Sequence, residues 1–423
     1  MASTRNADDT TSAALVASLG PGQVRPGSRG EAVDGVQPHL VITARTAANV
    51  STVVNEARAN RLAIIPCGGG TQLDRGNPPR CFDIRLSLTG LASIIERHGE
   101  DMTVTAEAGV TLAQLNRALA SRDQRFAVDA ASPQQATLGG IVAANSGGGL
   151  AHSFGAPRDL VLGMRVIDGR GRSLVLGGRV VKNVAGYDLP RLFTGSWGTL
   201  GVITEVTLRT HPLAPQATTM RLSFEDPASL EHARVALFAS ALPLAAMDFS
   251  TGTASSSWTL QLRIEGTSSE VDYQIDRVRS LCASPDERLE NQWLSSVHAN
   301  TTSDLVVIGV TRPKQCVEIA EQMFAAARKH TSNVSVSAHA GLGPVYLGCS
   351  TQGPEQEIAI VTDLRTVTGA CRARLLVSRC CAQVKPALDV WGQRPESFSL
   401  MANVKQRFDP DGILCPGRFV GRM

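Results

Sequence analysis

Residues 62–71 read Leu-Ala-Ile-Ile-Pro-Cys-Gly-Gly-Gly-Thr, an apolar run that leads directly into three consecutive glycines. The run predicts a strand because it is short, apolar and partly β-branched. Without Cβ atoms, Gly68, Gly69 and Gly70 let successive backbone N–H groups converge on an anion such as a pyrophosphate. The loop has neither the GxGxxG spacing nor the GK[ST] ending of other phosphate loops. Taken alone, it is equally consistent with a plain connection between strands.

The sequence on both sides of this loop predicts a small α/β layer. A strand at Leu40–Thr43 is followed by apolar residues at helical spacing in 50–57. Further strands are expected at Phe82–Leu86 and Met102–Ala106, and Thr111 is placed to cap a helix. The alternation of strands and helices is typical of a layered fold.

A second glycine-rich segment extends from Thr137 to Gly149. Its small residues suit a backbone that approaches a flat or anionic group closely, and Pro133 stiffens the chain before it. The alternative is a buried small-residue helix packed tightly on a sheet.

A third segment comprises Val181–Leu189 and Gly195–Ile203. Its glycines lead into a strand whose edge amides can face the carbonyls of a ring system. Lys182 could stabilise negative charge on such a ring, although a solvated surface lysine is an equally good interpretation. Asp188 can form an ion pair with Arg191.

Alternating apolar residues predict further strands around these segments. Leu162–Ile167 and Ser173–Leu176 form a predicted hairpin with its turn at 168–171, and Gly201–Arg209 alternates cleanly. The prolines in residues 211–215 indicate a domain boundary.

Beyond Pro215 the pattern predicts an α+β domain with β-α-β units on an antiparallel sheet. Strands are expected at Met220–Phe224, Trp258–Ile264, Leu305–Val310, Val334–Ser337 and Val345–Cys349. Helices are expected at Ser229–Ser240, Glu270–Leu281, Lys314–Arg328 and Ser397–Arg407.

Composition excludes several classes of protein. The 423 residues are 43% hydrophobic and 19% charged, which is ordinary for a globular chain long enough for two domains. The net charge of +3 is too balanced to indicate nucleic acid or an anionic membrane as the main partner. No apolar run approaches the length needed to span a bilayer, so direct membrane insertion is not expected.

The cysteines predict no metal site. There are nine, none in a CxxC arrangement, so a disulfide framework, zinc site or iron–sulfur site in this chain is not expected. Buried thiols in a reducing cytoplasm are the simplest interpretation.

The three segments described above, taken in this order, resemble the FAD-binding fold of the vanillyl-alcohol oxidase and p-cresol methylhydroxylase superfamily. Within it, the chain most resembles the FAD-binding E subunits of bacterial glycolate oxidases. The most specific stretches of this resemblance are KNVAGYDL (182–189), GSWG (195–198), LGVITE (200–205) and, in the tail, FDPDGILCPGRF (408–419). The resemblance is good over 38–215 and the tail, and loose over 216–388.

The resemblance implies a set of FAD-binding residues. The pyrophosphate would be bound by Cys67, Gly68, Gly69, Gly70, Thr71 and Gln72. The rest of the dinucleotide would contact Pro133, Thr137, Gly139, Gly140, Ala144, Asn145, Ser146, Gly147, Arg158, Asp159, Gly201, Val202 and Ile203. Catalytic residues are not identified, and Lys182 and Tyr187 are weak candidates.

Departures from the superfamily pattern carry information. Relatives with covalent FAD usually have a histidine at the end of the first loop, where this chain has Thr71 and Gln72. The resemblance therefore implies a non-covalent, dissociable FAD. Many relatives that oxidise 2-hydroxy acids hold a metal with paired histidines, and this chain lacks that pairing. Trp197 replaces a common glutamate and Cys415 the usual asparagine. The isolated histidines of the second domain are His232, His298, His330 and His339.

The resemblance implies a function within a complex. The chain would be the FAD-binding subunit of a cytoplasmic glycolate (2-hydroxy-acid) oxidase or dehydrogenase, associated with membranes through its partners if at all. Those partners would be a catalytic FAD subunit, which oxidises glycolate or D-lactate, and an iron–sulfur subunit. The alternatives are a stand-alone FAD-linked oxidoreductase and a non-catalytic scaffold subunit.

The expected fold class is α+β, with a two-part FAD-binding domain of the p-cresol methylhydroxylase (PCMH) type followed by a smaller ferredoxin-like cap domain. The expected divisions are a flexible extension (1–37), the FAD-binding domain (38–215), the cap (216–388) and a tail that returns to the FAD-binding domain (389–423).

Overall fold

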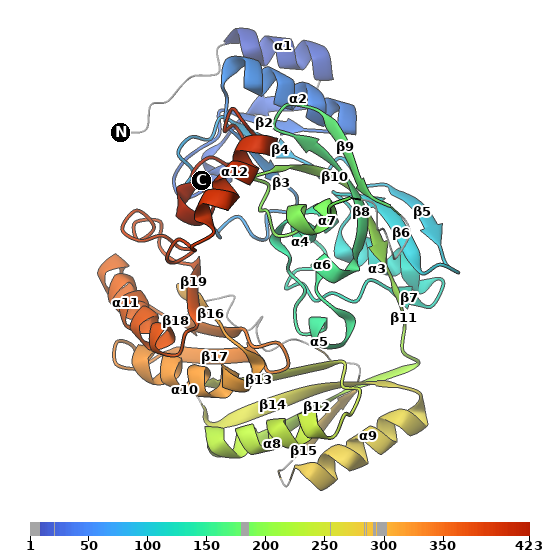
Figure 1. The fold of residues 1–423 in the computed structure, drawn as a ribbon, viewed down its shortest axis with the longest axis vertical. Coiled ribbons are helices and arrows are strands. Elements are labelled where there is room, and N and C mark those ends of the chain that lie inside the picture. Colours follow the sequence, from blue (N-terminus) through green and yellow to red (C-terminus); the bar gives the residue numbers. More distant parts are fainter. Residues whose placement is uncertain are drawn as a thin grey trace. The chain divides into compact units, whose positions relative to one another are not determined.

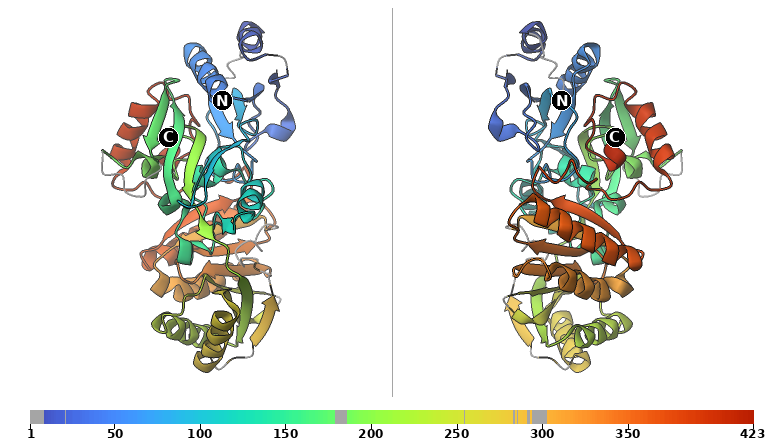
Figure 2. Two further views of the ribbon diagram at one scale, coloured as in Figure 1. Left: turned by 90° about the vertical axis from the view of Figure 1, so that its right-hand side faces the viewer. Right: turned by 90° about the vertical axis from the view of Figure 1, so that its left-hand side faces the viewer.

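The structure, a computed structural model of the chain, forms two compact units (Figures 1 and 2). The described residues are 9–20, 22–178, 186–253, 255–282, 284, 286–290, 293 and 303–423. Unit 1 comprises Met1–Gly147, Ala156–Pro212 and Gln393–Met423. Unit 2 comprises Gly148–Gly155 and Leu213–Gly392. Among the described residues, no helix combines the length and the apolar character needed to cross a lipid bilayer.

The first lobe of unit 1 is a four-stranded sheet in the order β1-β2-β4-β3. Strands β2, β3 and β4 are parallel, and β1 runs antiparallel to β2. The N-cap residue Thr46 begins helix α2 by accepting the N–H of Asn49, and the α2 side chains Val50, Val53 and Val54 are fully buried. The elements are α1 (Asp9–Leu19), β1 (Val24–Pro26), η1 (Arg29–Glu31), β2 (Leu40–Thr43), α2 (Ala47–Asn60), β3 (Ile64–Cys67) and β4 (Ile84–Ser87).

The second lobe of unit 1 is a five-stranded antiparallel sheet in the order β5-β6-β10-β8-β9. The carboxylate of Asp168 closes the β8–β9 hairpin by accepting the N–H groups of Arg170 and Arg172. The strands are β5 (Ile94–His98), β6 (Thr103–Glu107), β8 (Val161–Asp168), β9 (Ser173–Gly177) and β10 (Gly201–Arg209), with the short pair β7 (Gln124–Arg125) and β11 (His211–Pro212). The helices are α3 (Leu112–Ala120), α4 (Leu138–Ala144), α6 (Pro157–Leu160) and α7 (Leu189–Phe193).

The C-terminal tail belongs to unit 1 and lies beside β3. The N–H of Ile64 donates to the carbonyl of Ile413 at 2.8 Å, and the N–H of Cys415 donates to the carbonyl of Ile64 at 2.8 Å. The tail therefore extends the first sheet next to the strand that leads into the glycine loop. Its helices are α12 (Phe398–Phe408) and η4 (Val420–Arg422).

Unit 2 contains an eight-stranded antiparallel sheet in the order β15-β12-β14-β13-β17-β18-β16-β19. Helices α8, α9, α10 and α11 cover one face, because their apolar side chains share a single core cluster with alternate strand residues (Figure 1). The helices are α5 (Ala151–Phe154), α8 (Pro227–Ala239), α9 (Ser268–Leu281), η3 (Pro313–Gln315), α10 (Cys316–Ala327) and α11 (Pro354–Ala370). The strands are β12 (Gln216–Phe224), β13 (Ala246–Gly252), β14 (Ser255–Gly266), β15 (Asp286–Glu290), β16 (Leu305–Val310), β17 (Val334–His339), β18 (Val345–Cys349) and β19 (Arg374–Arg379).

The structure corrects three expectations from the sequence. Residues 9–20 and 22–37 were expected in a loose extension but include ordered elements, because α1 buries Leu15 completely and β1 pairs with β2. Residues 148–155 were expected in the FAD-binding domain but group with unit 2. The sheet of unit 2 is wider than predicted, because β13, β15 and β19 were not recognised and neither was α11.

Candidate functional site

The loop after β3 is shaped by a close approach of a second segment. A Cβ atom on Gly68 would lie 1.9 Å from Thr137 Oγ1, and one on Gly69 would lie 1.7 Å from the carbonyl oxygen of Gln135. Both distances are far below any real contact, so only glycine fits at these two positions. The resemblance implied that residues 67–72 and Thr137 contact one FAD molecule, and the structure brings Gly68 next to Thr137.

This pair of segments presents unused hydrogen-bond donors. In the described part of the chain, the N–H groups of Gly68, Gly69, Thr71 and Gln72 donate to no backbone carbonyl. The hydroxyl of Thr137 is buried and has no partner among the described residues, although Thr137 occupies the N-cap position of α4. Buried polar groups normally have partners. The arrangement therefore fits a ligand with several anionic oxygens, such as the pyrophosphate of a dinucleotide.

The second glycine-rich segment is a helix over much of its length. Within α4, a Cβ atom on Gly139 would lie 2.7 Å from the Cβ of Ala108, and the Gly139 N–H donates to the Ala108 carbonyl. The need for glycine at position 139 is therefore explained by the alternative interpretation, in which a small-residue helix packs tightly against its neighbour. The α4 C-cap Asn145 adopts a left-handed conformation, and its side chain accepts the N–H of Arg158 at 3.0 Å.

The predicted contacts at Gly201, Val202 and Ile203 lie at the start of β10. Strand β8 pairs with this stretch, whereas β6 pairs with β10 only from Glu205 onwards. The side chain of Val202 packs in the core of the first lobe and that of Ile203 in the core of the second. The start of β10 is thus the place where the two lobes of unit 1 meet.

A cation lies beside the glycine loop. Arg85 Nη2 is 3.3 Å from Cys67 Sγ and 3.8 Å from the Cβ position of Gly70. Burial raises the pKa of the Cys67 thiol, although the guanidiniums of Arg85 and Arg418 oppose this effect. The thiol therefore stays neutral, and the charge of Arg85 is not cancelled by it. Arg85 was not singled out from the sequence, because strand pairing is what places it next to Cys67.

We expect Arg85→Gln to weaken FAD binding about tenfold, because a charge-assisted contact to phosphate is lost. The measurement is the FAD dissociation constant, from the change in flavin fluorescence on titration. The binding of the variant should also depend less on salt. Arg45→Gln, at an exposed arginine, is the control. Equal affinity of the Arg85 variant and the wild type would contradict the assignment.

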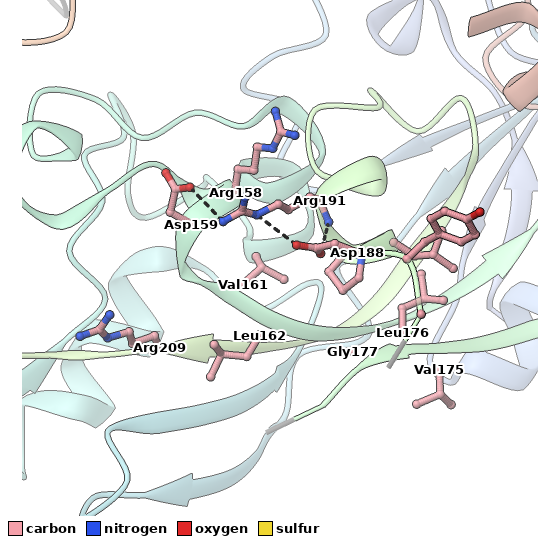
Figure 3. A pocket seen from close by; sticks show the side chains of 14 residues that line it. Arg158, Asp159, Val161, Leu162, Val175, Leu176, Gly177, Asp188, Arg191 and Arg209 are labelled. Atoms are coloured by element: carbon pink, nitrogen blue, oxygen red, sulfur yellow. Dashed lines mark hydrogen bonds and ion pairs between the residues drawn. The ribbon is translucent and has the colours of Figure 1, made fainter. Parts of the chain in front are cut away.

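Other candidates lie at a surface pocket of about 480 Å³ (Figure 3). Arg191 lies between Asp159, at 3.6 Å, and Asp188, at 3.2 Å, so the predicted Asp188–Arg191 ion pair is present. Arg158 and the 93% exposed Tyr187 also line this pocket, but no residue of the glycine loop does. Lys182 falls outside the described residues.

Unit 2 contains a buried polar pair that the sequence did not reveal. His339 Nδ1 lies 2.8 Å from Asp248 Oδ1, with side chains 5% and 0% exposed. The two residues face each other on neighbouring strands β13 and β17. Asp248 also influences His152. Burial lowers the pKa of His152, whereas a backbone hydrogen bond to Gly341 and the charge of Asp248 act to raise it. The sequence showed His339 only as an isolated histidine. It lies next to Asp248 because of the register between two strands that are far apart in the chain.

Comparison with known proteins gives a consistent result. Residues 38–177 match the family model described as FAD binding domain. Glycolate oxidase subunit GlcD of Bacillus subtilis is 24% identical over 424 residues, 91% of this chain and 89% of that protein. D-2-hydroxyglutarate dehydrogenase of Stutzerimonas stutzeri is 31% identical over 189 residues, 45% of this chain and 41% of that protein. Glycolate oxidase subunit GlcE of Escherichia coli is 35% identical over 183 residues, 43% of this chain and 50% of that protein.

The last two alignments each span half or less of the relative's length. Among solved structures, substrate-bound p-cresol methylhydroxylase has a TM-score of 0.72 at 16% identity, covering 97% of this chain and 96% of that chain. This similarity establishes the fold. The family model matched by residues 38–177, a range that includes the glycine loop, supports FAD as the cofactor. Residues 38–177 therefore form an FAD-binding domain with FAD as its cofactor, and the chain as a whole has the fold of p-cresol methylhydroxylase.

Proposed function

We propose that this chain is the FAD-binding subunit of a glycolate (2-hydroxy-acid) oxidase or dehydrogenase complex, and that it passes electrons towards an iron–sulfur partner subunit. The observation that carries the proposal is the 35% identity to GlcE over 183 residues. The similarity to GlcD over 91% of the chain supports the same type of complex. A catalytic FAD subunit would then oxidise a small 2-hydroxy acid such as glycolate or D-lactate.

The residues of unit 1 would bind and orient the cofactor. The N–H groups of loop 67–72 and the Thr137 hydroxyl would hold the pyrophosphate, while Arg85 neutralises part of its charge. The start of β10 would contact the remaining part of the dinucleotide. Bound FAD supplies the group that accepts electrons. With Thr71 and Gln72 at the end of the loop, where covalent relatives carry histidine, the flavin would be dissociable.

A stand-alone oxidoreductase is the second candidate. The buried Asp248–His339 pair favours it, because a carboxylate that orients an imidazole is a recurring element of proton-transfer sites. In that case this chain would oxidise the hydroxy acid without a catalytic partner. A scaffold subunit without flavin is the third candidate, and the unused donors of the glycine loop argue against it.

The visible spectrum of the purified chain separates these candidates. We expect a two-banded flavin spectrum, release of the flavin by acid, and no bleaching by glycolate or D-lactate under anaerobic conditions. Bleaching should appear once the catalytic partner is added. Bleaching of the chain alone would contradict the subunit proposal and support the stand-alone enzyme. A colourless protein that takes up no added FAD would overturn both and support the scaffold.

A further inference from the structure

A buried ion pair connects the C-terminal helix to two other segments of unit 1. The ammonium of Lys405 lies 2.5 Å from Asp409 Oδ2, and it donates to the carbonyls of Thr199 and Leu414 at 2.8 Å each. The Lys405 side chain is 13% exposed and the Asp409 side chain is fully buried. The three N–H donors of the ammonium thus have three acceptors, which is a complete set for a buried lysine.

Asp409 holds the tail by further hydrogen bonds. Its carboxylate accepts the N–H of Ile413 at 3.1 Å and that of Leu414 at 2.9 Å. Leu414 is the tail residue that pairs with Ile64 of β3, and Ile413 directly precedes it. Strand β3 then enters the glycine loop three residues later. The pair is therefore linked by backbone hydrogen bonds to the base of the loop that would hold the pyrophosphate.

Thr199 links the same ammonium to the opposite side of the site. It lies in the turn directly before β10, two residues from Gly201. The same turn is fixed to the end of α4, because the N–H groups of Gly195 and Trp197 donate to the carbonyls of Val142 and Ala143. Lys405 is thus bonded to the segment that carries the second set of expected FAD contacts.

We propose that Lys405, oriented by Asp409, is a positioning residue that sets the spacing between the two sides of the FAD site. One side is β3 with its glycine loop, and the other is the turn before β10 with the end of α4. The inference rests on the FAD contacts proposed above. Burying a charge is costly unless it is paired, so an ion pair at this junction resists small displacements of either side. If either side of the site moved, its hydrogen-bond donors would lie farther from FAD, although both lobes would remain folded.

The test uses two variants of the full chain. Lys405→Met removes the ammonium and leaves the Asp409 carboxylate buried without a cation, so it lowers stability as well. Lys405→Met combined with Asp409→Asn removes both charges and should recover much of that stability. We expect both variants to bind FAD about tenfold or more weakly than the wild type, because both lose the bond to Thr199. The dissociation constant is measured by flavin fluorescence at a temperature where circular dichroism shows each apoprotein folded.

Arg234→Met is the control, because it breaks the ion pair between the buried Arg234 and the partly exposed Glu231 on α8 of unit 2. It should lower stability but leave the FAD dissociation constant within about twofold. Recovery of FAD affinity together with stability in the double variant would overturn the positioning role and leave a structural one. A wild-type chain that binds no FAD would instead refute the FAD contacts on which this inference rests.

Discussion

Replacing Gly69 by leucine is expected to yield a folded chain that retains no FAD. Even a methyl group at this position would lie 1.7 Å from the Gln135 carbonyl oxygen, so the loop or the facing segment must move. Either movement separates the loop amides from the Thr137 hydroxyl, and those donors would no longer converge on one pyrophosphate. We expect the FAD dissociation constant to rise by at least about 100-fold. The ratio of flavin to protein absorbance after purification measures the effect directly.

Gly369→Leu is the matched control for this substitution. Gly369 lies in α11 of unit 2, and a Cβ atom there would meet nothing within 4 Å. This variant should keep the flavin content of the wild type, since leucine also has the higher helix propensity. Circular dichroism of both variants shows whether the fold is intact. Normal flavin content in the Gly69 variant would refute the assignment of this loop to the pyrophosphate.

Phe193→Ala should destabilise unit 1 by about 3–5 kcal/mol, because it empties a fully enclosed aromatic site. The Phe193 ring is 0% exposed and packs edge-on against Phe408, with centroids 5.0 Å apart and planes at 77°. This contact joins α7 of the second lobe to the end of α12. For a domain of this size the loss corresponds to a fall of about 10 °C in Tm. Differential scanning calorimetry of the apoprotein measures it.

The neighbouring Leu192 supplies the control. It lies on the same helix but is 37% exposed, so Leu192→Ala should cost less than about 1 kcal/mol. FAD affinity should fall in the Phe193 variant, since α12 carries Lys405 and the cavity loosens its attachment. A Phe193 variant as stable as the Leu192 variant would show that α12 contributes little to the folding of unit 1.

Local signals in the sequence determined most individual elements. Thr111 begins α3 as expected because a threonine hydroxyl can accept the N–H three residues later, and it does so with Gln114. The alternation of Gly201–Arg209 predicted β10 because side chains of a strand point to opposite faces. The glycine loop was recognisable because three consecutive glycines are costly in entropy unless a close approach requires them. These features depend on neighbours a few residues apart.

Only the tertiary structure decided which segments meet. The close contact of Gly69 with Gln135, the Asp248–His339 pair and the bond from Lys405 to Thr199 join residues far apart in sequence. No local pattern encodes these contacts, since strand order and register follow from how the whole core packs. For the same reason β19, whose neighbour β16 is distant in the chain, was missed. The sequence alone therefore located the glycine loop, and packing of the lobes decided which side chains and backbone groups lie around it.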